Sequence, residues 1–222
     1  MQFLKSSVGR KILIAVTGII MILFVIFHTL GNSTIYFNWL NAYADHLHAL
    51  PPLIWIYRIF MLVVLSVHVF FGIQLTIENN AAKPWAYACK KNLRATFASK
   101  NMIWTGMIIA VYLVYHLLHF TIRVINPELS ASQHIDVMGR PDVNKMVVLN
   151  FQNFFISFIY MLAMIVLALH LTHGTQSLFQ TLGLNNDKTM PVITKMGAIT
   201  AIILSLSYIS IPVLVLMGIL KV

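Results

Sequence analysis

The 222-residue chain is 59% hydrophobic and only 9% charged, with a mean hydropathy of +0.83. A soluble globular domain carries roughly 25% charged residues, so this composition excludes an ordinary soluble protein and predicts an integral membrane protein. The formal net charge of +9 does not predict a nucleic-acid partner, because the basic residues follow the pattern of a membrane topology.

Five apolar runs are each long enough to cross a bilayer, which takes about 20 residues. They predict a single all-α transmembrane domain over 1–222, with helices at about 11–31, 53–77, 102–122, 151–182 and 192–218. The first run lacks the cleavage-site pattern of a signal peptide, so we expect it to be retained. The fifth run contains no histidine, and its expected role is packing. The 124–149 connection is expected to carry a short interfacial helix.

Basic residues are concentrated on one side of these five predicted helices. That side carries Lys5, Arg10, Lys11, Lys83, Lys90, Lys91, Arg94, Lys100, Lys188 and Lys195. On the other side, Arg58, Arg123, Arg140, Lys145 and Lys221 are largely offset by Asp45, Glu128, Asp136 and Asp142. The positive-inside rule therefore predicts a cytoplasmic N-terminus and 78–101 loop, with the C-terminus outside. The basic loop predicts contact with anionic lipid or with a soluble partner, and a single cysteine, Cys89, excludes a disulfide within the chain.

Four of the apolar runs contain a histidine with a glycine at a repeated offset. Two runs share the spacing Thr-Gly-x9-His, as Thr17-Gly18 with His28 and Thr105-Gly106 with His116; two share His-x3-Gly, as His68 with Gly72 and His170 with Gly174. A histidine within a membrane span is costly and is by default a functional residue. Four histidines in matched pairs therefore predict a ligand set.

Helix direction converts these positions into depth, at about 1.5 Å per residue. Counted from the cytoplasmic end of its helix, His28 lies roughly 27 Å up and His116 roughly 24 Å up. His68 and His170 lie roughly 15 Å and 20 Å up on descending helices. His28 and His116 thus form an outer pair, and His68 and His170 form an inner pair.

Each pair draws one histidine from each of two helices, as the two axial ligands of one haem require. We therefore predict that the first four helices form a bundle around two stacked b haems. Iron with both axial positions filled has no open site for oxygen, so its expected role is electron transfer. A zinc site needs three or four ligands that converge on one point, which two pairs at different depths fit poorly.

The repeated glycines fit the same prediction. Gly72 and Gly174 lie one turn from their histidines on the same helix face and leave room for a flat ring. Gly18 and Gly106, about 15 Å below the outer pair, could admit the inner macrocycle between the first and third helices. Ordinary close packing of small residues is the alternative, since they are common at membrane helix contacts.

The remaining histidines are assigned by position. His119 and His173 each lie three residues from a favoured ligand, so they could be ligands themselves, partners of a haem propionate or satisfied interfacial residues. The repeated spacing favours His116 and His170. His46, His48 and His134 lie in outer connections, where solvated surface is expected.

This pattern resembles the dihaem cytochrome b subunit of succinate dehydrogenases and menaquinol:fumarate reductases. The likeness covers nearly the full length and includes the order of the four motifs, the connection LNAYADHLHALPP and the fourth-helix stretch HLTHGTQSLFQTLGL. The resemblance implies that His28 and His116 hold a distal haem and that His68 and His170 hold a proximal haem. One departure is that no acidic residue lies well inside a predicted span, so a transmembrane proton path through a buried glutamate is not supported.

The resemblance also implies partners and a location. It places a flavoprotein subunit that carries FAD and an iron–sulfur subunit on the cytoplasmic face of a bacterial inner membrane, with a possible dimer of the whole complex. It implies quinone chemistry, with menaquinone as the favoured quinone, in the 41–58 region. Because that chemistry needs groups that exchange protons, the candidates there are Asp45, His46, His48 and Arg58. The alternatives are another dihaem cytochrome b, either the quinone-linked anchor of a hydrogenase or formate dehydrogenase or an ascorbate-type cytochrome, and a haem-free transporter or scaffold.

Overall fold

A computed structural model describes residues 6–82 and 96–222 of the chain. Within those ranges the chain forms helices and turns without a strand, apart from one isolated antiparallel bridge between Ile135 and Pro141. Five helical segments are long and apolar enough to cross a membrane. The predicted transmembrane, all-α class is therefore confirmed at this level.

The five long helices correspond one to one with the predicted runs. They are α2 (Ser7–Ser33), α4 (Pro51–Ala81), α6 (Met102–His116), α8 (Phe154–Thr181) and α9 (Thr189–Leu216). A π-helical turn, Leu117–Thr121, continues α6. The fourth predicted run began too early, because the side chain of Asn153 accepts hydrogen bonds from the amides of Phe155 and Ile156 and so caps α8.

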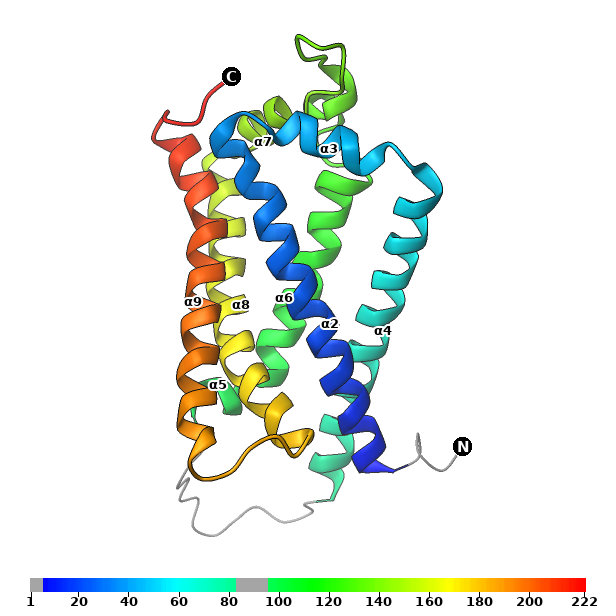
Figure 1. Ribbon diagram of the computed structural model, residues 1–222, viewed down its shortest axis with the longest axis vertical. Coiled ribbons are helices and arrows are strands. Elements are labelled where there is room, and N and C mark those ends of the chain that lie inside the picture. The colour runs from blue at the N-terminus through cyan, green and yellow to red at the C-terminus, as the bar shows by residue number, and fades with distance from the viewer. Residues whose placement is uncertain (1–5, 83–95) are drawn as a thin grey trace.

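Four of these helices form a ring in which each packs on its neighbours (Figure 1). α2 packs on α4 and α8, and α6 packs on α8 and, more lightly, on α4. It follows that α2 faces α6 across the ring and that α4 faces α8. This order decides which helices can supply opposite ligands to a central group.

α9 lies outside this ring and packs along α8 (Figure 1). The Ser205 hydroxyl of α9 donates a 2.9 Å hydrogen bond to the Met164 carbonyl of α8. Gly197 allows close approach at the other end of the contact, since a Cβ there would lie 3.0 Å from the Thr175 side chain.

Two shorter helices, α3 (Leu40–His48) and α7 (Val143–Phe151), lie across the upper end of the ring (Figure 1). α7 fulfils the prediction of a short helix in the 124–149 connection, preceded by the 3-10 turns Pro127–Leu129 and Ala131–Gln133. α3 was not predicted, and it depends on a tertiary contact. The Tyr43 ring packs on Gly31 of α2, where a Cβ would lie 2.5 Å from the tyrosine oxygen. Only glycine permits that approach.

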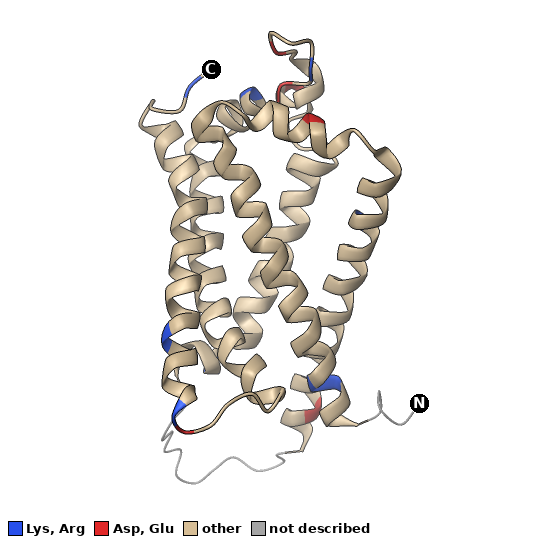
Figure 2. Cartoon of the chain, in the orientation of Figure 1, with Lys and Arg blue, Asp and Glu red and all other residues tan. Residues whose placement is uncertain are grey.

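Charged residues lie toward the two ends of the bundle (Figure 2). At the lower end, where α2 begins, the Arg10 guanidinium pairs with the Glu78 carboxylate of α4. At the upper end, Arg140 and Asp136 pair at 2.8 Å. Lys5 and Cys89, together with the basic residues of 83–95, lie outside the described residues, so the topology and the docking role of that loop stay predictions.

Candidate functional site

The outer pair of histidines meets across the ring with the two imidazole planes nearly perpendicular. The imidazole centroids of His28, on α2, and His116, at the end of α6, are 6.1 Å apart, with ring planes at 86°. Aromatic side chains line this level: Phe24 stacks on His28 at 5.2 Å, and the Tyr112 and Tyr160 rings lie 5.9 Å from His116. In the described part of the chain, the buried Nδ1 of His116 has no hydrogen-bond partner.

This spacing fits two imidazoles that share one metal ion. A first-row metal lies about 2.0–2.1 Å from each imidazole nitrogen, so two rings on opposite sides of it have centroids roughly 6 Å apart. Neutral imidazole is also a ligand type that suits iron. The observed separation of 6.1 Å between His28 and His116 therefore fits a bis-histidine iron site.

The inner pair lies lower in the ring and on its other diagonal. The Thr17 hydroxyl of α2 lies 3.0 Å from Nδ1 of His68 on α4, and the Thr105 hydroxyl of α6 lies 3.1 Å from Nδ1 of His170 on α8. Thr17 precedes His28 by 11 residues along α2, which places the inner level about 16 Å below the outer one. The structure therefore brings the four predicted histidines together at two depths.

The repeated glycines contact the inner histidines directly. A Cβ at Gly18 would lie 3.6 Å from Cε1 of His68, and one at Gly106 would lie 3.2 Å from Cε1 of His170. Their immediate neighbour is therefore an imidazole ring, where the sequence had suggested the macrocycle itself. Among the described residues, nothing beyond the backbone of its own helix and its chain neighbours lies within 4 Å of a Cβ placed at Gly72, whereas a Cβ at Gly174 would meet only the Met102 methyl group, at 3.7 Å.

His119 uses both ring nitrogens in a buried network, which argues against it as the outer ligand. Its Nε2 lies 2.7 Å from Oδ1 of Asn150, and its Nδ1 lies 2.9 Å from the Tyr160 hydroxyl. The Asn150 amide donates to the Met146 carbonyl at 2.9 Å, so Oδ1 accepts and His119 Nε2 donates. Sequence reasoning did not identify Asn150 and Tyr160. His119 lies within the π turn Leu117–Thr121 that follows His116, and such turns are frequent at functional sites.

His173 remains a second candidate beside His170. Its Nδ1 is buried and has no partner among the described residues. His170 is distinguished by its contact with Thr105, which repeats the contact of His68 with Thr17. His134 was expected to be solvated but is half-buried, with a buried Nε2.

Two of the four quinone candidates, His48 and Arg58, contact each other at the upper end of the bundle. Nε2 of His48 lies 3.3 Å from a guanidinium nitrogen of Arg58, which also stacks over the Trp55 ring at 5.2 Å. Asp45 and His46 lie exposed on α3 and take no part in this contact. Burial and the nearby charge of Arg58 lower the pKa of Arg123, so these two guanidinium groups lie near each other at this end.

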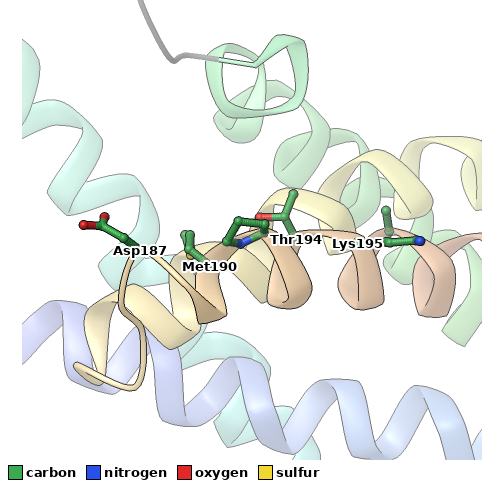
Figure 3. Close-up of a pocket in the computed structure, with 6 residues that line it drawn as sticks. Asp187, Met190, Thr194 and Lys195 are labelled. Carbon is green, nitrogen blue, oxygen red and sulfur yellow. The ribbon is translucent and has the colours of Figure 1, made fainter.

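Two surface hollows contain none of the predicted haem or quinone residues. One lies where α9 begins and is lined by Asp187, Met190, Pro191, Thr194, Lys195 and Ala198 (Figure 3). The other is an apolar groove between α4 and α6, lined by Ile73, Thr76, Ile77, Ile103, Trp104 and Met107. The described residues also contain no group of three or more His, Cys, Asp or Glu side chains placed to hold a metal ion. The paired histidines thus remain the main candidate site.

No protein-family model, curated protein or solved structure matches the chain. Any functional assignment must therefore come from the histidine pairs, their depth in the ring and their contacts.

Proposed function

We propose that this chain is the dihaem cytochrome b anchor of a succinate:quinone or quinol:fumarate oxidoreductase. In this role it passes electrons between a membrane quinone, with menaquinone favoured, and an iron–sulfur subunit. The observation that carries the proposal is the placement of two histidine pairs at two depths, each on diagonally opposite helices of one ring. Dicarboxylate chemistry belongs to the flavoprotein partner and not to this chain.

Each histidine pair has a defined role in this proposal. His28 and His116 hold the distal haem, and His68 and His170 hold the proximal haem. Each bound haem supplies an iron that accepts and releases one electron. Aromatic rings line the level of the outer pair, and among the described residues α4 has open space beside Gly72.

The polar groups at the two ends suit the proposed partners. At the upper end, His48 and Arg58 are in contact and could exchange protons with a quinone; Asp45 and His46 are the remaining candidates nearby. At the lower end, the described basic residues Lys11, Lys100 and Lys188 would face the iron–sulfur and FAD-containing subunits.

The test is the reduced-minus-oxidised spectrum of the purified complex, with haem counted per copy of this chain. We expect two b-type haems in the natural protein and one each in His28→Ala and His170→Ala. His134→Ala, in an outer turn, is the matched control and should keep two. Complete absence of haem would overturn the proposal and leave the histidines to a proton path or a scaffold.

The identity of the co-purifying subunits separates this function from other dihaem cytochromes. Flavoprotein and iron–sulfur subunits that interconvert succinate and fumarate are expected. A hydrogenase or formate dehydrogenase subunit in their place would assign the same haem sites to a different complex.

A further inference from the structure

We propose that Thr17 and Thr105 are positioning residues for the inner pair. Their hydroxyls hold His68 and His170 in the tautomer that carries hydrogen on Nδ1, which leaves Nε2 of each ring as the iron ligand. The inference rests on the proposed function and specifies which atoms of the inner site act.

The first contact fixes the tautomer of His68 by its donors and acceptors. The Thr17 hydroxyl lies 2.7 Å from the Leu13 carbonyl and 3.1 Å from the Ile14 carbonyl, to which it donates its single hydrogen. Toward His68 it can therefore only accept. Nδ1 of His68 also lies 3.2 Å from the Ile14 carbonyl, which is an acceptor alone. Nδ1 must carry the hydrogen, and Nε2 keeps its lone pair.

The second contact repeats the first on the other two helices. The Thr105 hydroxyl donates to the Met102 carbonyl, three residues earlier, at 3.0 Å, and so accepts from Nδ1 of His170 at 3.1 Å. In both helices the next residue is a glycine that faces the imidazole; a Cβ would lie 3.6 Å from Cε1 of His68 at Gly18 and 3.2 Å from Cε1 of His170 at Gly106. Two separate occurrences of one arrangement make an accidental contact a poor explanation.

Within residues 6–82 and 96–222, neither His28 nor His116 has a threonine contact of this kind, which makes the outer pair an internal comparison. Nδ1 of His116 is buried without a partner in the described part of the chain. An imidazole that donates its second N–H becomes a more basic metal ligand and so favours the more highly charged ferric iron. Removal of the hydroxyls should therefore raise the midpoint potential of the inner haem and leave that of the outer haem unchanged.

The test replaces each threonine by valine, which keeps the shape and removes the acceptor, and by serine, which keeps the hydroxyl. In Thr17→Val and Thr105→Val, we expect inner-haem affinity to fall about 10- to 100-fold. Spectroelectrochemical titration should show one midpoint potential raised and the other unmoved; a tenfold weaker preference for ferric iron corresponds to about 59 mV. Thr17→Ser and Thr105→Ser should restore both values.

Thr172→Val is the matched control, because this α8 hydroxyl donates to the Ala168 carbonyl of its own helix. It should leave both potentials unchanged. Loss of the inner haem in the valine variants, with retention in the serine variants, also supports the proposal. Unchanged potentials in both valine variants, or equal loss in valine and serine variants, would overturn it. Absence of haem from the natural protein is a different result, since that outcome rejects the proposed function itself.

Discussion

Alanine substitutions at Gly18 and Gly106 can be compared directly, because the space for an added Cβ differs between the two positions. A Cβ at Gly106 would lie 3.2 Å from Cε1 of His170, closer than an ordinary carbon contact, whereas one at Gly18 would lie 3.6 Å from Cε1 of His68. Gly106→Ala must therefore push its histidine by a few tenths of an ångström, away from the 3.1 Å bond to Thr105. Gly18→Ala fits without movement.

The expected magnitude follows from packing energies. Overpacking a well-packed site costs typically about 1–3 kcal/mol, and both alanines gain a similar helix propensity of about 0.5–1 kcal/mol relative to glycine. The propensity term cancels between the two variants. Because His170 must return to its place to bind iron, the strain should appear as about 5- to 150-fold weaker inner-haem binding in Gly106→Ala than in Gly18→Ala.

The assay is haem titration of the purified protein, with each haem resolved by its midpoint potential. Gly106→Leu should lose the inner haem altogether and keep the outer one. Equal inner-haem affinity in the two alanine variants would refute the reasoning, as would preferential loss of the outer haem in Gly106→Ala.

Two further predictions concern the upper end of the bundle. His116→Leu should lose one haem, whereas His119→Leu should keep both and lower the free energy of unfolding by about 1–3 kcal/mol, because Asn150 loses a buried partner; haem counting and thermal unfolding measure the two effects. The second concerns Asp136, whose pKa is lowered to about 2 by hydrogen bonds from Arg140. A carboxyl group with a depressed pKa stabilises the folded turn above its unfolded pKa of about 3.9 and loses that effect as the pH falls toward the folded value. Hydrogen exchange should therefore show the 136–140 turn loosening between about pH 4 and pH 2, and Asp136→Asn should show the loosened turn already at neutral pH.

The transmembrane helices could be predicted from sequence because hydropathy alone decides them. Their ends and the short helices could not be predicted as well, since these depend on particular side chains. Asn153 starts α8 three residues later than the apolar run suggested. α3 forms where Tyr43 packs on Gly31, a contact between residues that no periodicity connects.

At the candidate site, too, residues within one helix could be predicted from their spacing, whereas contacts between helices could not. The repeated spacings predicted the four histidines as candidate ligands, since each motif stands within one helix. They did not reveal that the Thr17 hydroxyl contacts Nδ1 of His68, because that contact requires α2 to lie beside α4. The choice between His116 and His119 likewise required the buried network of Asn150.

The contacts also explain why the motifs occur in this order along the chain. Each rising helix, α2 or α6, gives its Thr-Gly pair to the histidine of the descending helix that packs beside it. The same rising helix gives its own histidine, 11 residues later, to the outer level, where His28 meets His116. Under the proposed ligation, each half of the ring therefore supplies one ligand to each haem, and neither half can complete a bis-histidine site alone. Loss of one histidine should then remove the haem held between one pair of opposite helices and leave the haem between the other pair in place. Single-histidine variants are therefore expected to keep one haem.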